Sequence, residues 1–371
     1  MKNGLIARAW AIILMLLMCL GCVSCAHEGE EPFEKALADK ILGEMTVEEK
    51  VGQLFLLHGY KTPEENLHAA EKYNAGGIIL FADFFEDGTP ESVSKSITAM
   101  QSKSKLPMFI GVDEEGGEVS RISVFEQYRD EPFKSPRKLM KTGGEELVRK
   151  DTAEKCKLLK SMGFNLNLAP VSDVSTDKDD FIYSRSAGNA KTAAKYVGAY
   201  VEESNCECVG CCLKHFPGYG NNDDTHTDGS LDKRSYESFE KTDFVPVSAG
   251  IEAGVGMIMV SHNTVECMDA DCPASLSDEV HRILREELGF GGVVVTDDLG
   301  MDAIAENYGT GEAAVIAIEC GNDMITTSDL EEQYKAVLEA VQSGRISETR
   351  LDRSVRRILE YKIVLGIITE K

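Results

Sequence analysis

Eight short apolar runs alternate with amphipathic helical patterns along this chain of 371 residues, and that alternation restricts its fold more than any single motif does. The strand-like runs are Gln53–His58, Gly77–Ala82, Pro107–Val112, Phe164–Pro170, Val209–Leu213, Gly256–Ser261, Gly292–Thr296 and Asp323–Thr327. The helical patterns are Leu37–Val51, Glu145–Met162, Lys191–Ser204, Tyr236–Glu252, Asp278–Leu288, Gly311–Glu319, Leu330–Ser343 and Thr349–Leu365. This order predicts an α/β fold, a (β/α)₈ TIM barrel that forms one domain over residues 37–371. A doubly wound open sheet is the alternative.

The first 25 residues differ in character from the rest. Lys2 and Arg8 form a basic start, and Ala9–Leu20 is an apolar core of twelve residues that is too short to span a membrane. Small residues and cysteines follow, as in a bacterial lipoprotein signal, which this segment resembles. We therefore expect a signal peptide over residues 1–25, with Cys22 or Cys25 as the lipid-bearing residue, and an acidic tether over residues 26–36. The protein is expected to be exported and extracytoplasmic, anchored to the outer face of the cytoplasmic membrane, with no other membrane contact.

The charge of the chain limits its partners. A formal net charge of −24 disfavours nucleic acid, because the phosphate backbone would be repelled. Neutral sugars are more compatible with this charge.

The cysteines of the mature region raise the question of metal binding. Cys206-x-Cys208-x-x-Cys211-Cys212 has the look of a metal cluster, but it runs into a predicted strand. Neighbouring side chains on a strand point to opposite faces, so they do not converge on one ion. We predict buried thiols here and no metal site. Cys267 and Cys272 could form a short-loop disulfide.

Polar residues follow most of the predicted strands at the point where each strand ends. They are Asp113, Asp173, Lys214 with His215, Ser261 with His262, and Asp297 with Asp298. In a barrel these positions share the carboxyl rim, where the catalytic groups of such folds lie. The pattern therefore predicts an enzyme. For His58 and His262, packing at the rim is favoured over a direct role.

The seventh run ends in Thr296-Asp297-Asp298. A carboxylate fixed at a strand end suits a nucleophile that attacks an anomeric carbon. Asp298 is expected to cap the following helix, which leaves Asp297 available for chemistry.

A second candidate group follows the fifth run, where the turn formers Pro217, Gly218 and Gly220 precede Asp224-Thr225-His226. The carboxylate of Asp224 can bind one ring nitrogen of His226 and leave the other for proton transfer. An Asx turn with a surface histidine is the alternative.

Two arginines come with these groups. After the third run, Asp113 could accept hydrogen bonds from two adjacent hydroxyls, and Arg121 could brace it or reach the ligand. A purely structural Asp–Arg pair is the alternative. Ser184-Arg185-Ser186 supplies another guanidinium.

Taken together, these segments resemble the family-three glycoside hydrolases, in the single-domain branch typified by bacterial β-N-acetylhexosaminidases. The resemblance runs from Met45 to the C-terminus. Its motifs are Met45–Phe55, Asp113–Arg121, Ala169-Pro170-Val171-x-Asp173, Ser184-Arg185-Ser186, Lys214–Gly220 with Asp224-Thr225-His226, and Thr296-Asp297-Asp298-Leu299-x-Met301.

The resemblance implies a retaining hydrolase that removes terminal non-reducing β-linked N-acetylglucosamine from cell-wall fragments or other β-linked glycans, without a cofactor. It implies that Asp297 is the nucleophile and that His226, oriented by Asp224, is the acid/base. The remaining motif residues would bind the sugar: Asp113, Arg121, Arg185, Lys214 and His215.

Two departures and several alternatives accompany this interpretation. Glu118 stands where an arginine is common, and Asn221–Asp223 places three residues where the branch has four. A β-glucosidase or a glycoside phosphorylase of the same family is an alternative activity. A non-catalytic carbohydrate-binding lipoprotein is another, and so is a metal-dependent barrel hydrolase that uses His215, His226, His262 and an aspartate.

Overall fold

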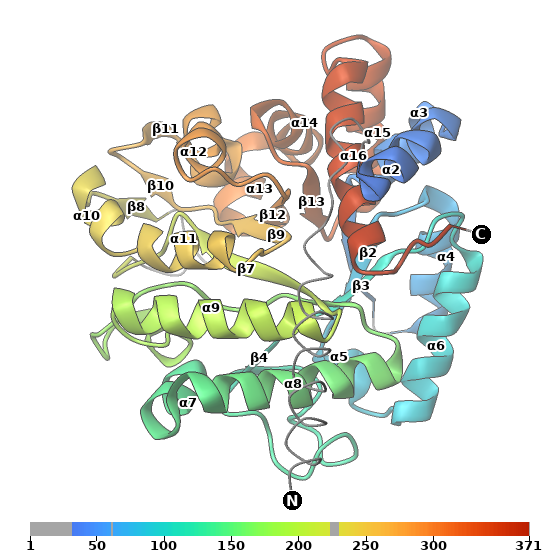
Figure 1. Cartoon of the computed structure of the whole chain (residues 1–371). Helices are drawn as coiled ribbons and strands as arrows, with labels where there is room; N and C mark the ends of the chain where they lie inside the picture. Colours follow the sequence, from blue (N-terminus) through green and yellow to red (C-terminus); the bar gives the residue numbers. More distant parts are fainter. Residues whose placement is uncertain (1–31, 61, 223–229, 371) are drawn as a thin grey trace, which may run out of the picture.

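Eight parallel strands close into a barrel with helices around it (Figure 1). The computed structural model describes residues 32–60, 62–222 and 230–370. The ring runs β1-β2-β3-β6-β7-β9-β12-β13, and it closes because Phe55 of the first strand pairs with Ile325 of the last. This confirms the (β/α)₈ TIM barrel. The open doubly wound sheet is wrong, since its edge strands would remain unpaired.

Every barrel strand coincides with a predicted run. The strands are β1 (Phe55–His58), β2 (Gly77–Leu80), β3 (Phe109–Val112), β6 (Leu166–Asn167), β7 (Gly210–Phe216), β9 (Met257–Val260), β12 (Val293–Asp298) and β13 (Met324–Thr327). Two of them, β7 and β12, continue past the apolar residues that predicted them, so Lys214, His215, Asp297 and Asp298 are strand residues.

The helices that cover the barrel largely follow the predicted patterns. They are α2 (Phe33–Glu44), α3 (Val47–Gln53), α4 (Pro63–Tyr73), α5 (Ala82–Phe85), α6 (Pro90–Lys103), α7 (Pro136–Thr142), α8 (Gly144–Met162), α9 (Ala190–Cys206), α10 (Tyr236–Lys241), α11 (Phe244–Glu252), α12 (Asp278–Arg282), α13 (Asp302–Tyr308), α14 (Thr310–Cys320), α15 (Leu330–Gln342) and α16 (Glu348–Val364). Short helical turns are η1 (Phe181–Ser184), η2 (Ala274–Leu276) and the π-helical η3 (Ile283–Glu287).

Two predicted helices are each interrupted in the structure, and a third, Asp278–Leu288, continues from α12 into the π-helical η3. The predicted helix Leu37–Val51 is divided into α2 and α3 because Thr46 begins a new helix with a capping box, in which Thr46 Oγ1 accepts from Glu49 N at 3.3 Å and Glu49 Oε2 accepts from Thr46 N at 3.1 Å. The predicted helix Tyr236–Glu252 is divided into α10 and α11 at Thr242, whose backbone is not helical. Helix α2 also begins at Phe33, so the last residues of the predicted tether belong to its first turn.

Alternate residues of β7 and β12 face different apolar layers. Cys212, Val293 and Val295 pack in the cluster that fills the barrel, whereas Cys211 and Val294 pack in the layer formed with α9 and α11. The two adjacent cysteines are therefore buried on opposite faces, as the strand period predicts.

Two small sheets lie beside the barrel. Strands β4 (Glu114–Gly116) and β5 (Val119–Ser120) form a hairpin after β3, and β8 (Leu231–Asp232), β10 (Thr264–Val265) and β11 (Asp269–Pro273) form the other sheet. Cys267 and Cys272, for which a short-loop disulfide was one possibility, are both free thiols. Cys267 lies in the turn after β10, and Cys272 lies where the β10–β11 register shifts, so the two side chains are not a cross-strand pair.

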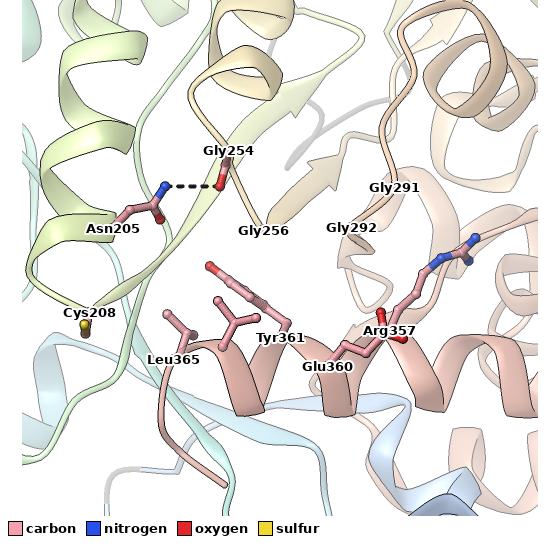
Figure 2. Close-up of a pocket in the computed structure, with 11 residues that line it drawn as sticks. Asn205, Cys208, Gly254, Gly256, Gly291, Gly292, Arg357, Glu360, Tyr361 and Leu365 are labelled. Carbon is pink, nitrogen blue, oxygen red and sulfur yellow. Dashed lines mark hydrogen bonds between the residues drawn. The ribbon is translucent and has the colours of Figure 1, made fainter. Parts of the chain in front are cut away.

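Helix α16 closes the amino end of the barrel (Figure 2). The Tyr361 hydroxyl accepts from Cys211 N at 3.0 Å and donates to Cys211 O at 3.2 Å. A cavity of about 430 Å³ lies beside this ring, bordered by Gly254, Gly256, Gly291 and the end of α16. Its lining is mostly apolar and lacks the polar residues that end the strands.

The first and last helices of the described chain pack together, since α2 contacts α16 and α3 contacts both α15 and α16 (Figure 1). An ion pair between Lys50 Nζ and Asp352 Oδ1, at 2.7 Å, joins these helices. Within the described ranges, no helix has the length and apolar character that a membrane crossing requires.

Candidate active site

A cavity of about 210 Å³ opens at the carboxyl end of the barrel. Every predicted site residue within the described part of the chain lines it: Asp113, Arg121, Arg185, Lys214, His215 and Asp297. These residues come from β7, β12 and the segments after β3, β5 and η1. The parallel register of the barrel brings them together, because it places all the strand ends on one rim.

Lys214 and Arg185 share one buried carboxylate, that of Glu115. Glu115 Oε1 lies 2.8 Å from Lys214 Nζ and 2.8 Å from Arg185 Nη2, while Oε2 accepts from Arg185 Nε at 3.0 Å. Burial alone would raise the pKa of Glu115, but the two cations hold that pKa well below its ordinary value. Glu115 is therefore an anion that fixes two donor groups toward the cavity.

Asp113 binds Lys214 rather than Arg121. Its Oδ1 is hydrogen-bonded to Lys214 Nζ. Burial lowers the pKa of Lys214, whereas Asp113 and Glu115 raise it by more, so the ammonium is retained. The prediction that Arg121 could brace Asp113 is therefore wrong.

Arg121 is held by its backbone instead. Glu114 Oε2 accepts from Arg121 N at 3.0 Å and from Ile122 N at 2.8 Å, which fixes the turn after β5. The guanidinium lies over the ring of Phe81 at 6.0 Å. Within the described part of the chain, Arg121 Nε is buried without a hydrogen-bond partner, so it could serve a ligand in the cavity. Glu118, which stands in the place of an arginine, is exposed and accepts a hydrogen bond from Ser184.

Asp173 fixes the ring of His215. Asp173 Oδ2 lies 2.7 Å from His215 Nδ1, and His215 Nε2 lies 3.3 Å from Arg185 Nη2. A guanidinium can only donate, so Nε2 accepts and Nδ1 carries the proton that Asp173 accepts. Burial raises the pKa of Asp173, but His215 and the N–H of Tyr219 outweigh it and hold that pKa below the ordinary value.

The two aspartates at the end of β12 differ in their surroundings. Asp297 lines the cavity, and its Oδ1 accepts from Asp298 N at 2.9 Å. The prediction that Asp298 caps the next helix is wrong, because α13 begins after Met301. Its Oδ1 accepts from Gly300 N at 2.9 Å and from Ser328 N at 3.1 Å, so Asp298 stabilises the loops after β12 and β13.

Asp224 and His226 lie outside the described residues. The chain leaves the barrel toward them beside His215, where the Tyr219 ring packs edge-on against the imidazole at 5.0 Å. Asn222 Nδ2 donates to Tyr219 O at 2.7 Å and to Asp232 Oδ2 at 2.6 Å, which fixes the last described residue before them.

The sequence alone assigns no site role to Glu115 and His58, which line the cavity, or to Asp173, which holds the ring of His215. Glu115 has no predicted role within the Asp113–Arg121 motif, although a second acidic residue after an apolar strand is a signal that could have indicated a site residue. Asp173 is predicted as a strand-end residue and as part of the Ala169–Asp173 motif, without a role of its own. His58 was interpreted as a packed histidine, and the structure places it in the cavity.

The described histidines of the metal-dependent alternative make hydrogen bonds within the protein. His262 Nδ1 lies 2.7 Å from Ser275 Oγ, and its Nε2 lies 3.0 Å from the backbone oxygen of Asp298. In residues 32–60, 62–222 and 230–370, no group of three or more His, Cys, Asp or Glu side chains is placed to hold a metal ion.

The chain is similar to known proteins over most of its length. Residues 46–361 match the family model described as the glycosyl hydrolase family 3 N-terminal domain. The β-hexosaminidase LpqI of Mycobacterium tuberculosis is 29% identical over 330 residues, which are 85% of this chain and 82% of that protein. A β-N-acetylglucosaminidase/β-glucosidase of Cellulomonas fimi is 29% identical over 88% of this chain and 59% of its own length.

A solved family 3 β-N-acetylglucosaminidase from Paenibacillus sp. str. FPU-7 superposes with a TM-score of 0.82 at 32% identity. The match covers 88% of this chain but 64% of that one, so this chain spans less than two thirds of the Paenibacillus protein. The family model covers most of the chain, and the barrel superposes on that of the Paenibacillus enzyme, so the protein belongs to glycosyl hydrolase family 3.

Proposed function

We propose that the protein is a retaining β-N-acetylhexosaminidase that removes terminal non-reducing β-linked N-acetylglucosamine. The observation that carries the proposal is the cavity at the carboxyl rim, which the Asp297 carboxylate lines together with a set of fixed donors that includes Lys214 and Arg185. The family and the named β-hexosaminidase relatives support this substrate class.

The proposed reaction has two displacements. The Asp297 carboxylate attacks the anomeric carbon while His226 donates a proton to the leaving oxygen, which gives a glycosyl ester on Asp297. His226 then removes a proton from water, which attacks the same carbon and frees Asp297. Each displacement inverts the carbon, so the configuration is retained overall.

The donors of the cavity would bind the sugar. Lys214 and Arg185 carry only N–H groups, so they bind hydroxyl or carbonyl oxygens of the sugar, and Asp113 can accept from its hydroxyls. Glu115 holds the two cations in place whether or not the sugar is bound.

Aryl glycosides with different leaving groups test the roles of Asp297 and His226. Asp297→Ala should abolish turnover of every aryl β-N-acetylglucosaminide, because no nucleophile remains. His226→Ala should slow poor leaving groups by about 10²–10⁴-fold and spare good ones, since these need little protonation. The measurement is kcat/KM against leaving-group pKa, with exposed Asp302→Ala as the control that keeps activity.

Covalent labelling gives an independent check. A 2-fluoro sugar should trap an ester that peptide mass spectrometry locates on Asp297. A label on another residue, or equal and mild losses in both variants, would contradict the proposed roles.

A β-glucosidase is the second candidate, because the Cellulomonas fimi relative carries both names. The ratio of kcat/KM for the aryl β-N-acetylglucosaminide to that for the aryl β-glucoside decides between them. A ratio above one supports the first proposal, and a ratio below one supports the second.

We also propose that the protein is exported and anchored through Cys22 or Cys25, on the basis of the basic start and the apolar Ala9–Leu20 segment. Cells fed a labelled fatty acid should yield labelled protein, and replacement of the anchoring cysteine by alanine should remove the label. Unlabelled wild-type protein in the soluble cell fraction would contradict the anchor.

A further inference from the structure

His58 ends β1 and lies across the barrel from Lys214 on β7. Around the ring, β1 is separated from β7 by β13, β12 and β9, so the two strands are diametrically opposed. Lys214 and His215 on β7 and His58 on β1 all line the same cavity. A sugar held by Lys214 therefore presents its other edge toward β1.

The orientation of the His58 ring is fixed on two sides. It stacks on Phe81 with the ring centroids 3.9 Å apart and the planes 15° from parallel. Its Nδ1 lies 3.2 Å from Asp298 Oδ2. The same Phe81 lies under the Arg121 guanidinium, so one aromatic ring supports two polar groups of the cavity.

Asp298 determines which nitrogen of His58 carries the proton. Burial raises the pKa of Asp298, but hydrogen bonds from His58 and from Gly300 N outweigh burial and lower it, so the carboxylate is ionised. An ionised carboxylate only accepts hydrogen bonds, and His58 Nδ1 is therefore the donor. In the neutral imidazole this leaves Nε2 as an acceptor.

That acceptor is available to a ligand. Nε2 of His58 has no hydrogen-bond partner among the described residues, and the side chain is 42% exposed at the cavity. Lys214 on the opposite strand carries only N–H donors and has no acceptor capacity. A polar hydrogen on the sugar edge that faces β1 would thus find this imidazole nitrogen as an acceptor, in addition to the carboxylates that line the cavity.

We infer that His58 Nε2 accepts a hydrogen bond from an O–H or N–H group of the bound sugar, which makes His58 a specificity-determining residue of the site. The inference rests on the proposed function, because it takes the occupant of the cavity to be a glycoside. It adds a contact on β1 to the predicted binding residues, none of which lies on that strand.

Two substitutions separate contact with the sugar from support of Asp298. In His58→Asn the amide can replace Nδ1 as the donor to Asp298, but nothing replaces Nε2. In His58→Gln the longer amide can take the place of Nε2, while the donor to Asp298 is lost. Melting temperatures and circular dichroism establish that both variants are folded.

The readout is the discrimination between a glycoside and its analogue that lacks one polar hydrogen. The probes are the 4-nitrophenyl β-N-acetylglucosaminide, the matching β-glucoside, and the 3-, 4- and 6-deoxy N-acetylglucosaminides. For each pair the ratio of kcat/KM values is compared between variants, so that a general loss through Asp298 cancels.

Each ratio is kcat/KM of the N-acetylglucosaminide divided by kcat/KM of the analogue. If His58 contacts the sugar, one of these ratios should fall about five- to tenfold, to near one, in His58→Asn. The same ratio should stay at the wild-type value in His58→Gln. The pair whose ratio falls identifies the N–H or O–H that His58 binds. Unchanged ratios in His58→Asn for every pair would overturn the inference, as would equal changes in both variants.

Failure of the proposed function has a different signature. In that case the wild-type protein turns over none of the glycosides, and calorimetry detects no binding of N-acetylglucosamine or glucose. A wild-type enzyme that is active but has ratios insensitive to His58→Asn refutes only the role of His58.

Discussion

Glu115 shows how a residue can shape a binding site through the charges that it balances. It is fully buried, yet it binds the ammonium of Lys214 and, through two hydrogen bonds, the Nε and Nη2 edge of the Arg185 guanidinium. Without this carboxylate two cations would lie a few ångströms apart in the protein interior, where charge repulsion is screened weakly. The donors of the cavity are therefore held by a residue that itself contributes little surface to it.

Glu115→Gln should destabilise the protein by about 3–5 kcal/mol, because it leaves a buried cation without its partner. The measurement is the free energy of unfolding in urea at pH 7. Glu118→Gln is the matched control, since Glu118 lies in the same hairpin but is exposed, and it should change stability by less than about 0.5 kcal/mol. Equal effects of the two substitutions would contradict the assigned role of Glu115.

The stabilities of the wild-type protein and of Glu115→Gln should also differ in their dependence on pH. The pKa of Glu115 is lowered in the folded state, so its contribution is complete above the unfolded carboxyl value of about 4.3 and is lost as the pH falls below it. The difference in unfolding free energy between wild type and Glu115→Gln should therefore be constant from pH 7 to pH 5 and shrink below about pH 4. A difference that grows on acidification would contradict the ionised state of Glu115.

At this scale the sequence predicted which residues gather at the rim better than it predicted their partners. Asp297, Lys214 and His215 could be placed because they follow apolar runs. Glu115 could not, because its importance depends on Arg185 from a distant loop. The orientation of His58 likewise depends on Phe81 and on Asp298, which no local pattern connects to it.

Among the secondary-structure elements, α16 has the clearest structural task, since it fills the amino end of the barrel with Tyr361. Gly256, just before β9, has no side chain because the ring lies where a Cβ would be. A Cβ built there would lie 2.0 Å from Tyr361 Cε2.

Gly256→Ala should therefore lower stability by about 1–3 kcal/mol through displacement of the tyrosine ring. The change is measured as a shift in melting temperature. Gly291 borders the same cavity, but a Cβ there would meet nothing within 4 Å. The control Gly291→Ala should therefore leave the melting temperature nearly unchanged. Activity per folded molecule should be kept in both variants, because the site is at the other end of the barrel. A Gly256→Ala protein as stable as Gly291→Ala would show that the ring moves freely.

The elements were predictable where apolar periodicity defines them, and less so where polar chemistry interrupts it. Strands β7 and β12 continue through Lys214 and Asp297 because these side chains find partners on the rim, which hydropathy alone does not register. Helices α4 and α6 were not predicted, since each buries only three side chains and presents mainly polar residues. The predicted helix Leu37–Val51 runs across Thr46, whereas in the structure the capping box at Thr46 begins a new helix.

At the scale of the whole molecule, the net charge of −24 should affect stability through self-repulsion. Raising NaCl from 10 to 150 mM shortens the screening length from about 30 to about 8 Å. We expect the melting temperature to rise by a few degrees. KCl at the same ionic strength is the control and should give the same rise, because screening does not depend on the identity of the cation. A melting temperature that falls with salt would mean that surface ion pairs outweigh the repulsion.

The pairing of Phe55 with Ile325 also decides when this protein can begin to work. A polypeptide that has emerged only as far as its seventh strand already contains Asp297 and Lys214, but its ring of strands is still open beside His58. We therefore expect N-terminal fragments of the chain to be inert, and hydrolysis to start only once Thr327 has joined the first strand.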